Sequence, residues 1–354
     1  MNNSILAQNI RDIAVNMGFE SCGIVKIEAL EEYEEKLDER IEMCPASKPV
    51  LETLRKYARL KEYYTWAKSV IVCITRYGKY SVPEEFKGLI GKYYLYDHKL
   101  QPHSEMAANI ISFENYLSSQ GIRFYKELHG ITSGRLAALK AGLGIIRKNN
   151  FLYTRSGSWV IIDTWLIDCD MELIEPAQYG DCPEGCSKCI DACPTKALSK
   201  PYCTDLTTCI TRLTWGINDL PPKELRDKMK AWIYGCDECQ NVCPMNKFTW
   251  ETGQNYPGLK ELAERFSLEN IHYMDENKLA DDLLTKFSFI RSENLWIWKV
   301  NALRAMANSY KEEYEKYFIE AQRDENEKVR EMANWIIGQH ATMNPKYHSA
   351  NGQN

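Results

Sequence analysis

The first half of the chain alternates between helical and strand-like patterns of apolar residues. Residues 3–18 carry apolar side chains at helical spacing and stop at Gly18, which is typical of a helix that ends in a glycine. The same spacing predicts helices over residues 105–118 and 133–141. Apolar runs predict strands at 22–27, 69–75, 122–125 and 158–167. This mixture predicts an α+β domain that ends near residue 175.

The pattern becomes helical throughout beyond residue 259. Two similar segments, at 295–308 and 328–338, lie about 30 residues apart and carry Ala, Leu, Ile and Trp on one face. This spacing is typical of α-solenoid repeats, although a plain helical cap would contain the same two helices. Residues from Asn344 onward lack a periodic apolar face, and we expect them to form a frayed tail.

Composition narrows the class of protein. The chain has 354 residues and a formal charge of −5, and its Lys and Arg are scattered, which does not favour a nonspecific nucleic-acid coat. A local basic groove for RNA is still compatible with this charge. There is no apolar stretch of the ~18 residues that span a membrane, and no basic segment followed by an apolar run at the start. We therefore expect a cytoplasmic protein without a membrane partner, whose 13 cysteines remain in a reducing compartment.

The most specific chemistry lies in two groups of closely spaced cysteines, each of which ends in Cys-Pro. The first group is Cys182, Cys186, Cys189 and Cys193, and the second is Cys236, Cys239 and Cys243, with Cys209 alone between them. Bacterial ferredoxins bind two 4Fe–4S clusters with such runs, and the last cysteine of each run binds the other cluster. Soft thiolate ligands suit iron–sulfur clusters, so these cysteines are the candidate ligands.

The crossed pattern predicts two ligand sets: Cys182, Cys186, Cys189 and Cys243 for the first cluster, and Cys193, Cys209, Cys236 and Cys239 for the second. The opening C-x3-C is one residue longer than the usual C-x2-C, which makes Cys182 the unusual ligand. Two structural zinc sites are the alternative, because zinc also takes four cysteines at C-x2-C spacing. The remaining cysteines are expected to be buried apolar residues or free thiols, although Cys203 could replace Cys209: Cys22, Cys44, Cys73, Cys169 and Cys203.

Several phrases resemble the epoxyqueuosine reductases, which are cobalamin-dependent iron–sulfur enzymes of queuosine modification in tRNA and relatives of the reductive dehalogenases. The phrases are Leu139-Lys-Ala-Gly-Leu-Gly144, Lys148-Asn149, Gly157-Ser-Trp159, and residues 189–198, 209–214 and 232–246. Ala-Gly-Leu-Gly before Lys-Asn, together with Gly-Ser-Trp, is more discriminating than the cysteine phrases. The resemblance covers residues 135–250 well, and the stretch after Cys209 favours Cys209 over Cys203 as a ligand.

The resemblance implies a fold of three parts. A nitroreductase-like α+β domain (1–177) would bind base-off cobalamin, a ferredoxin-like domain (178–250) would hold both clusters, and a helical, HEAT-like domain (259–343) would precede the tail at 344–354. The absence of an Asp-x-His-x-x-Gly motif is compatible with a corrinoid that has no protein ligand. Nine residues are implied at the cobalamin pocket: Arg135, Gly142, Gly144, Arg147, Lys148, Asn149, Gly157, Ser158 and Trp159.

The chain departs from the family's pattern at the catalytic acid. The family has an aspartate upstream of the Arg–Ala-Gly-Leu-Gly stretch, where this chain has Leu128, which cannot donate a proton. The flanking Glu127 and His129 are therefore candidate acids, and both are equally compatible with ordinary surface residues. His98 is a third candidate for proton transfer or substrate contact. Its segment, which could instead serve packing, also contains Tyr93, Tyr94, Tyr96 and His103.

A second departure lies in the implied cofactor loop. The family's Gly-Trp-x-Gly-Lys is here Gly144-Ile-Ile-Arg147-Lys148, so a tryptophan and a glycine are replaced. Both departures weaken the assignment of a specific substrate more than the assignment of the cofactor.

The leading interpretation is a reductase of the epoxyqueuosine reductase type. An external low-potential donor of the ferredoxin or flavodoxin type would pass electrons through the two clusters to cobalamin as Co(I), and from there to a queuosine-related nucleoside in tRNA or another small electrophile. The helical C-terminus would dock the RNA, as the resemblance implies. One alternative is an electron-transfer or activation protein that reduces the corrinoid of a partner protein. A ferredoxin-like structural subunit would leave the N-terminal domain unexplained.

Overall fold

The computed structural model describes residues 3–96, 104–127, 131, 133–176, 179–250 and 253–343, with side chains up to 339. The chain forms two compact units, each assembled from separate stretches. The first comprises Met1–Ser81, Tyr96–Thr207 and Asp237–Pro257, and the second comprises Val82–Leu95, Thr208–Cys236 and Gly258–Asn354. The division into contiguous domains that the sequence suggests stays a prediction.

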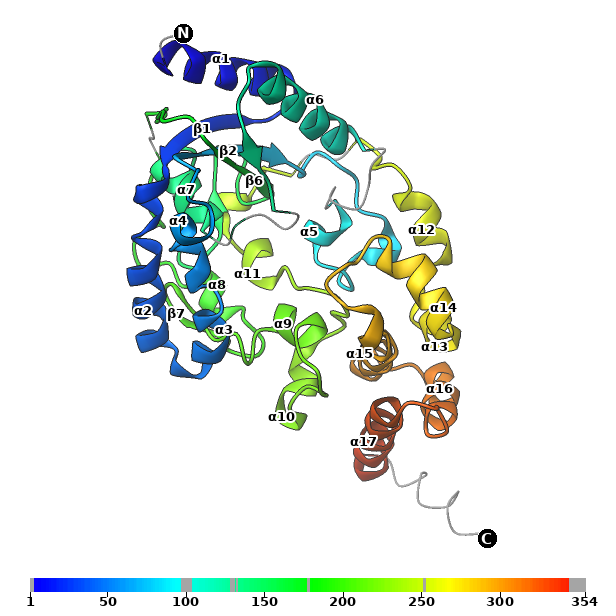
Figure 1. Ribbon diagram of the computed structural model, residues 1–354. Coiled ribbons are helices and arrows are strands. Elements are labelled where there is room, and N and C mark those ends of the chain that lie inside the picture. The colour runs from blue at the N-terminus through cyan, green and yellow to red at the C-terminus, as the bar shows by residue number, and fades with distance from the viewer. Residues whose placement is uncertain are drawn as a thin grey trace, which may run out of the picture. The chain divides into compact units, whose positions relative to one another are not determined.

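An antiparallel sheet organises the first unit (Figure 1). In the described part it has four strands in the order β1 (Ser21–Lys26), β2 (Ser69–Arg76), β6 (Val160–Ile167) and β3 (Phe124–Tyr125). The central strand β2 pairs along its length with both neighbours, and Cys73 lies opposite Cys22 and Asp163. Nearly every residue of β2 is buried, as its continuous apolar run predicts for a strand covered on both faces.

Helices α1 (Asn3–Asn16) and α6 (Glu105–Ser119) cover one face of this sheet. Alternate strand residues such as Ile71 and Cys73 point to that face, because side chains of a strand alternate between its two sides. They pack against Ile10 of α1 and Phe113 of α6. The helices that the sequence predicts over 3–18 and 105–118 are therefore confirmed, and their apolar stripes form one half of the core.

The opposite face is covered by α7 (Gly134–Lys140), with α2 (Tyr33–Met43), α3 (Lys48–Glu52) and α4 (Leu60–Tyr63) beside it. Val70 and Val72 of β2 pack here with Leu136 of α7 and Leu37 of α2. The sequence pattern predicts no element between residues 28 and 68. The charge-rich helix α2 was missed there, because its apolar stripe is short.

Small elements complete the first unit. There are two hairpins, β4 (Ile145–Ile146) with β5 (Leu152–Tyr153) and β7 (Leu198–Lys200) with β8 (Cys203–Thr204), and two one-turn helices. These helices, α8 (Lys188–Asp191) and α11 (Glu238–Asn241), contact each other. Each begins inside one of the two cysteine groups, so α8 and α11 place those groups side by side.

The second unit is helical in its described part. Its elements are α5 (Lys92–Leu95), α9 (Ile210–Trp215), α10 (Lys223–Arg226), α12 (Leu259–Arg265), α13 (Leu268–Tyr273), α14 (Glu276–Leu279), α15 (Trp296–Asn308), α16 (Glu315–Ala321) and α17 (Glu327–Met343). Helix α15 packs against α13 and α17 and is buried along most of its length. Its Asn301 donates from Nδ2 to the carbonyls of Thr214 and Ile233, at 2.8 and 3.0 Å. These two hydrogen bonds connect α15 to the segment that carries Cys209 and Cys236.

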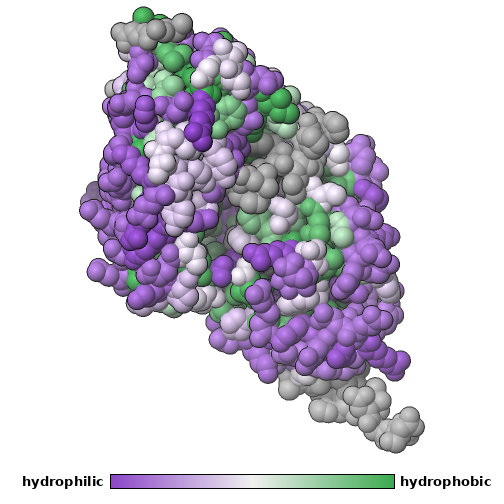
Figure 2. All heavy atoms as spheres, viewed as in Figure 1, coloured by the Kyte–Doolittle hydropathy of each residue, from purple (hydrophilic) through white to green (hydrophobic). Residues whose placement is uncertain are grey.

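Hydrophilic side chains predominate over α2 and over α16 and α17 on the face of the molecule drawn in Figure 2. Among the described residues, we find no helix with the length and apolar character that crossing a bilayer requires. The tail expected from Asn344 lies outside the described residues.

Candidate functional site

Four of the eight predicted cluster ligands line one pocket of the first unit. Cys182, Cys186, Cys189 and Cys243 line a small cavity of about 10 Å³. Three of them come from the first cysteine group and one from the second, which is the crossed combination expected for the first cluster. Cys243 is 54 residues from Cys189 in the chain, so only the fold can bring these sulfurs together.

The local structure around the cysteines explains their arrangement. Cys189 lies on α8, and the backbone N–H of Cys193 donates to the carbonyl of Ile190 at 3.2 Å just after this helix. Cys243 N–H donates in the same way to Gln240 after α11, at 3.3 Å. A proline follows each of these two cysteines, and proline cannot continue a helix because it has no N–H. The two groups therefore turn away from their helices in the same manner.

The electrostatics of this pocket favour a cation. Burial raises the pKa of the Cys189 thiol, and the nearby sulfurs of Cys243 and Cys182 raise it further. Thiolates this close repel one another unless positive charge lies between them. Metal coordination removes that cost because a bound metal deprotonates its thiols, and iron–sulfur clusters prefer soft sulfur ligands. The donor set thus fits an iron–sulfur cluster.

Arg147, Lys148 and Asn149 line the same pocket, although the resemblance implies them at a cobalamin site. Lys148 Nζ donates to the carbonyl of Cys186 at 2.8 Å. Asn149 Nδ2 donates to the hydroxyl of Tyr153 at 2.9 Å and to the carbonyl of Cys239 at 3.3 Å. The loop that follows β4 therefore lines the pocket of the four cysteines. Tyr153, which also lies next to Cys243, carries no sequence signal and was missed by the sequence analysis.

Close packing accounts for the three glycines of the implied cobalamin set. A Cβ on Gly142 would lie 2.0 Å from the carbonyl oxygen of Glu175, and one on Gly144 would lie 2.6 Å from that of Tyr153. Gly157 has φ +75° and would place a Cβ 2.6 Å from Asn246 Oδ1. Glycine is required at these positions because another part of the protein approaches the backbone closely.

The last three residues of the implied cobalamin set also make contacts with other parts of the protein. Ser158 Oγ accepts hydrogen bonds from Gln240 and Asn246, and Trp159 is buried at 5.2 Å from the ring of Trp250. Arg135 donates to the carbonyl of Asn150 and lines a mainly apolar cavity between α2 and α7. The nine residues, all within the described ranges, therefore do not surround one common cavity.

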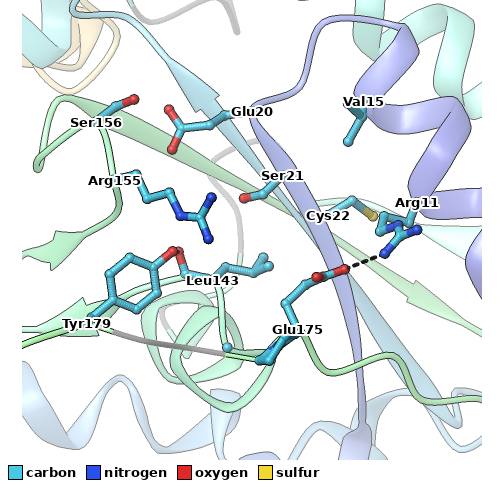
Figure 3. A pocket seen from close by; sticks show the side chains of 12 residues that line it. Arg11, Val15, Glu20, Ser21, Cys22, Leu143, Arg155, Ser156, Glu175 and Tyr179 are labelled. Atoms are coloured by element: carbon cyan, nitrogen blue, oxygen red, sulfur yellow. Dashed lines mark hydrogen bonds and ion pairs between the residues drawn. The ribbon is translucent and has the colours of Figure 1, made fainter.

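A separate cavity of about 470 Å³ lies beside β1 (Figure 3). Its charged lining includes an ion pair in which Arg11 Nη1 is 2.9 Å from Glu175 Oε1. Tyr179 donates from its hydroxyl to the carbonyl of Leu143 at 3.0 Å. Of the nine residues implied for cobalamin, Gly142 alone lines this cavity. Its charges of both signs point to no particular reaction.

The ligands predicted for the second cluster are divided between the two units. In the first unit, Cys193 Sγ accepts a hydrogen bond from the backbone N–H of Leu198 at 3.5 Å, and Cys239 lies on α11. In the second unit, Cys209 immediately precedes α9, and Cys236 packs against an apolar cluster that contains Ile210. Each unit thus carries two of the four cysteines, and their convergence stays a prediction.

Two of the three candidate acids, His98 and His129, lie outside the described residues, as do Leu128 and His103. Glu127 is described, and its Oε2 accepts a hydrogen bond from the Tyr57 hydroxyl at 3.0 Å. Tyr94 and Tyr96 serve packing. In the second unit the Tyr94 hydroxyl accepts from Trp215 Nε1 at 3.1 Å, and in the first unit fully buried Tyr96 donates to the carbonyl of Ser81 at 2.9 Å.

One expectation about the other cysteines is wrong. Cys44 and Cys203 are joined by a disulfide, with their sulfurs 1.99 Å apart, where the sequence analysis expected unpaired residues. The sequence does not predict this disulfide, because 159 residues separate Cys44 from Cys203. A disulfide sulfur has no thiolate to offer, so the alternative of Cys203 as an iron ligand does not fit this structure. Cys22 and Cys73 are free and buried, as expected.

Comparison with known proteins agrees with this site. A family model described as a 4Fe-4S double cluster binding domain matches residues 182–246. The epoxyqueuosine reductase of Cellulophaga algicola is 32% identical over 292 residues, which cover 78% of this chain and 89% of that protein. The enzyme of Leadbetterella byssophila is 30% identical over 257 residues, covering 71% of this chain and 84% of that protein.

Solved structures show the same fold. An epoxyqueuosine reductase from Bacillus subtilis with its catalytic loop swung out of the active site matches with a TM-score of 0.77 and 23% identity, covering 99% of this chain and 96% of that chain. An epoxyqueuosine reductase crystallised with an epoxyqueuosine-modified stem loop of tyrosine tRNA matches with a TM-score of 0.76 at 23% identity, over the same shares of the two chains. Because its sequence is at least 30% identical to these two relatives over more than two thirds of its length, this chain belongs to the epoxyqueuosine reductase family of oxidoreductases.

Proposed function

We propose that this protein reduces epoxyqueuosine in tRNA with electrons that pass through two 4Fe–4S clusters. The observation that carries the proposal is the pocket formed by Cys182, Cys186, Cys189 and Cys243, because it unites two distant cysteine groups in the order that a double-cluster protein requires. These four thiolates would hold the first cluster. Cys193, Cys209, Cys236 and Cys239 would hold the second.

The chemistry needs electrons and protons together. Removal of an epoxide oxygen as water takes two electrons and two protons, so a side chain must donate a proton as the oxygen departs. We propose Glu127 and His129 as the candidate donors and His98 as a candidate contact to the substrate. Tyr57 holds the Glu127 carboxylate in place through the hydrogen bond from its hydroxyl. A cytoplasmic ferredoxin or flavodoxin would supply the electrons.

Cobalamin dependence rests on the family resemblance alone. When bound, cobalamin supplies a nucleophilic Co(I) centre, and the cofactor would then carry the difficult step. The nine residues implied for it do not fit one cofactor site, because they serve packing or line three separate cavities. We therefore derive no step through cobalamin.

The tRNA substrate is proposed from the relative that was crystallised with a modified tRNA stem loop. We propose that the first unit is nitroreductase-like and that α15 and α17 of the second unit belong to a HEAT-like array that docks the RNA. The second candidate function, reduction of the corrinoid of a partner protein, is favoured by Leu128, which stands where the family has its catalytic aspartate.

The test uses anaerobically reconstituted protein, epoxyqueuosine-containing tRNA and a chemical reductant, with and without added cobalamin. Conversion of epoxyqueuosine to queuosine, measured by nucleoside mass spectrometry, supports the proposal. Loss of conversion in His129→Gln but not in Glu127→Gln, with iron content unchanged in both, would identify His129 as the acid. A protein with both clusters that converts no tRNA but reduces a corrinoid protein would instead establish the second function.

A further inference from the structure

We propose that the cavity between α2 and α7 binds a small amphipathic anion, that is, a molecule with an apolar body and one carboxylate or phosphate head group. The cavity has a volume of about 460 Å³ and lies within the first unit. Pockets that bind small molecules typically have volumes of about 300–1,000 Å³. The inference goes beyond the reaction proposed above and does not depend on the clusters.

The walls of this cavity suit an apolar body. Four apolar side chains line it: Met43 of α2, Leu136 and Leu139 of α7, and Ile146 of β4. Leu139 is 38% exposed, although leucine side chains are most often buried in a protein. An apolar group inside the cavity would remove these side chains from water, which is favourable.

The two carboxylates of the lining are already paired with lysines. Lys36 Nζ lies 2.8 Å from Glu39 Oε1, and Lys140 Nζ forms an ion pair with Glu32. The charges within each pair balance. Neither carboxylate is therefore left to neutralise a further cation of the cavity.

Arg40 and Arg135 also line the cavity, and neither has a carboxylate partner in the part of the chain that the structure describes. Arg135 donates to the backbone carbonyl of Asn150, which is uncharged. Burial lowers the pKa of Arg40, and the charge of Arg135 lowers it further. A negatively charged group in the cavity would stabilise both cations. Carboxylates and phosphates match the fork of donors on a guanidinium group.

The hydroxyl of Tyr33 is a third donor without an acceptor. Tyr33 lines the cavity and is 6% exposed, and its hydroxyl oxygen is buried without a hydrogen-bond partner among the described residues. Buried polar groups of proteins are nearly always hydrogen-bonded, so an unpaired one needs an explanation. An oxygen of an anionic head group would accept from this hydroxyl.

The ligand of this cavity is inferred to differ from cobalamin. Of the nine residues implied for cobalamin, Arg135 alone lines the cavity, and Arg40 and Tyr33 do not belong to that set. Competition with cobalamin tests this distinction.

The test is isothermal titration calorimetry of the reconstituted full-length protein with three probes: octanoate, octyl phosphate and the uncharged 1-octanol. We expect saturable binding of at least one of the anions and binding about tenfold weaker for 1-octanol. Arg40→Gln should weaken binding of the anion about tenfold, the order expected for the loss of one charge-assisted hydrogen bond. Arg59→Gln is the matched control and should bind as the wild type does. Arg59 is an exposed arginine of the first unit that pairs with Glu34 outside the cavity lining.

Three results would overturn the inference: no binding of either anion, equal binding of 1-octanol and the anions, or displacement of the anion by hydroxocobalamin, which would make the cavity part of the cofactor site. An unchanged affinity in folded Arg40→Gln would overturn it as well. If Arg40→Gln does not fold, Leu139→Trp decides, because a larger side chain at this half-open position should fill the cavity and abolish binding. An unchanged affinity in Leu139→Trp contradicts the inference. Conversion of epoxyqueuosine and iron content test the proposed function separately.

Discussion

Asn246 and Ser158 are joined by reciprocal hydrogen bonds. Asn246 Oδ1 accepts from the Ser158 backbone N–H at 2.8 Å, and Asn246 Nδ2 donates to Ser158 Oγ at the same distance. Both residues are buried. Ser158 lies two residues before β6 and Asn246 three residues after Cys243, so this pair fastens the second cysteine group to the sheet of the first unit. The position of Cys243 depends on it.

Replacement of Asn246 by alanine tests this dependence. The change leaves buried donors and acceptors without partners, and we expect the free energy of unfolding to fall by about 1–3 kcal/mol. The absorbance of the clusters should also be lost at a lower urea concentration. Asn334→Ala is the control, because Asn334 is exposed and should be close to neutral. Equal urea midpoints for the two variants would contradict the proposed role of Asn246.

Gly157→Ala should be strongly destabilising for two separable reasons. The backbone has φ +75°, and the new Cβ would lie 2.6 Å from Asn246 Oδ1. Gly121→Ala is a matched control, since Gly121 has φ +70° with nothing within 4 Å of an added Cβ. The control should cost about 1–2 kcal/mol, which is the cost of the left-handed conformation alone. We expect a larger loss for Gly157→Ala in chemical denaturation, and equal losses would show that Asn246 moves aside freely.

The crossed ligand sets predict a specific pattern of iron loss. Cys243→Ser should reduce the iron content from about eight to about four per chain, because it removes one ligand of one cluster. The double variant Cys189→Ser, Cys243→Ser should also keep about four irons, since both residues would serve the same cluster. Cys169→Ser is the control, because this free cysteine belongs to neither predicted ligand set. A double variant without iron would assign Cys189 and Cys243 to different clusters.

His272 should make the stability of the protein sensitive to acid. Burial on α13 lowers the pKa of this histidine below its usual value near 6.5, while Glu320, at 3.5 Å from its Nε2, offsets part of that effect. The unfolded chain therefore takes up a proton at a higher pH than the folded one. Stability is complete above about pH 6.5 and is lost as the pH falls toward the folded-state pKa, by at most about 1.4 kcal/mol per pH unit.

The measurement compares urea denaturation of wild type and His272→Gln at pH 7.5 and at pH 5.5. The loss of stability between these two values should be smaller in the variant, since glutamine does not titrate. An identical loss in both proteins would mean that other groups cause the acid sensitivity.

The sequence by itself determined the elements whose pattern is local. Sequence alone predicts the apolar runs of β2 and β6 and the apolar stripes of α1, α6 and α15. The reason is that residues close together in the chain determine whether a helix or strand can bury one face. The spacing of the cysteines and the two Cys-Pro pairs likewise predicted double-cluster chemistry, since ligands held on short turns must be close in the chain.

Only the tertiary structure decided which residues meet. It paired Cys44 with Cys203, turned Arg147 and Asn149 toward the cysteines, and placed Tyr153 beside Cys243 across 90 residues of chain. Such contacts follow from how layers pack, and packing depends on the volume and polarity of residues far apart in sequence. The sequence pattern identifies residues that belong to a site, such as the cysteines. The fold determines the distances between these residues, and therefore whether they can bind the same group.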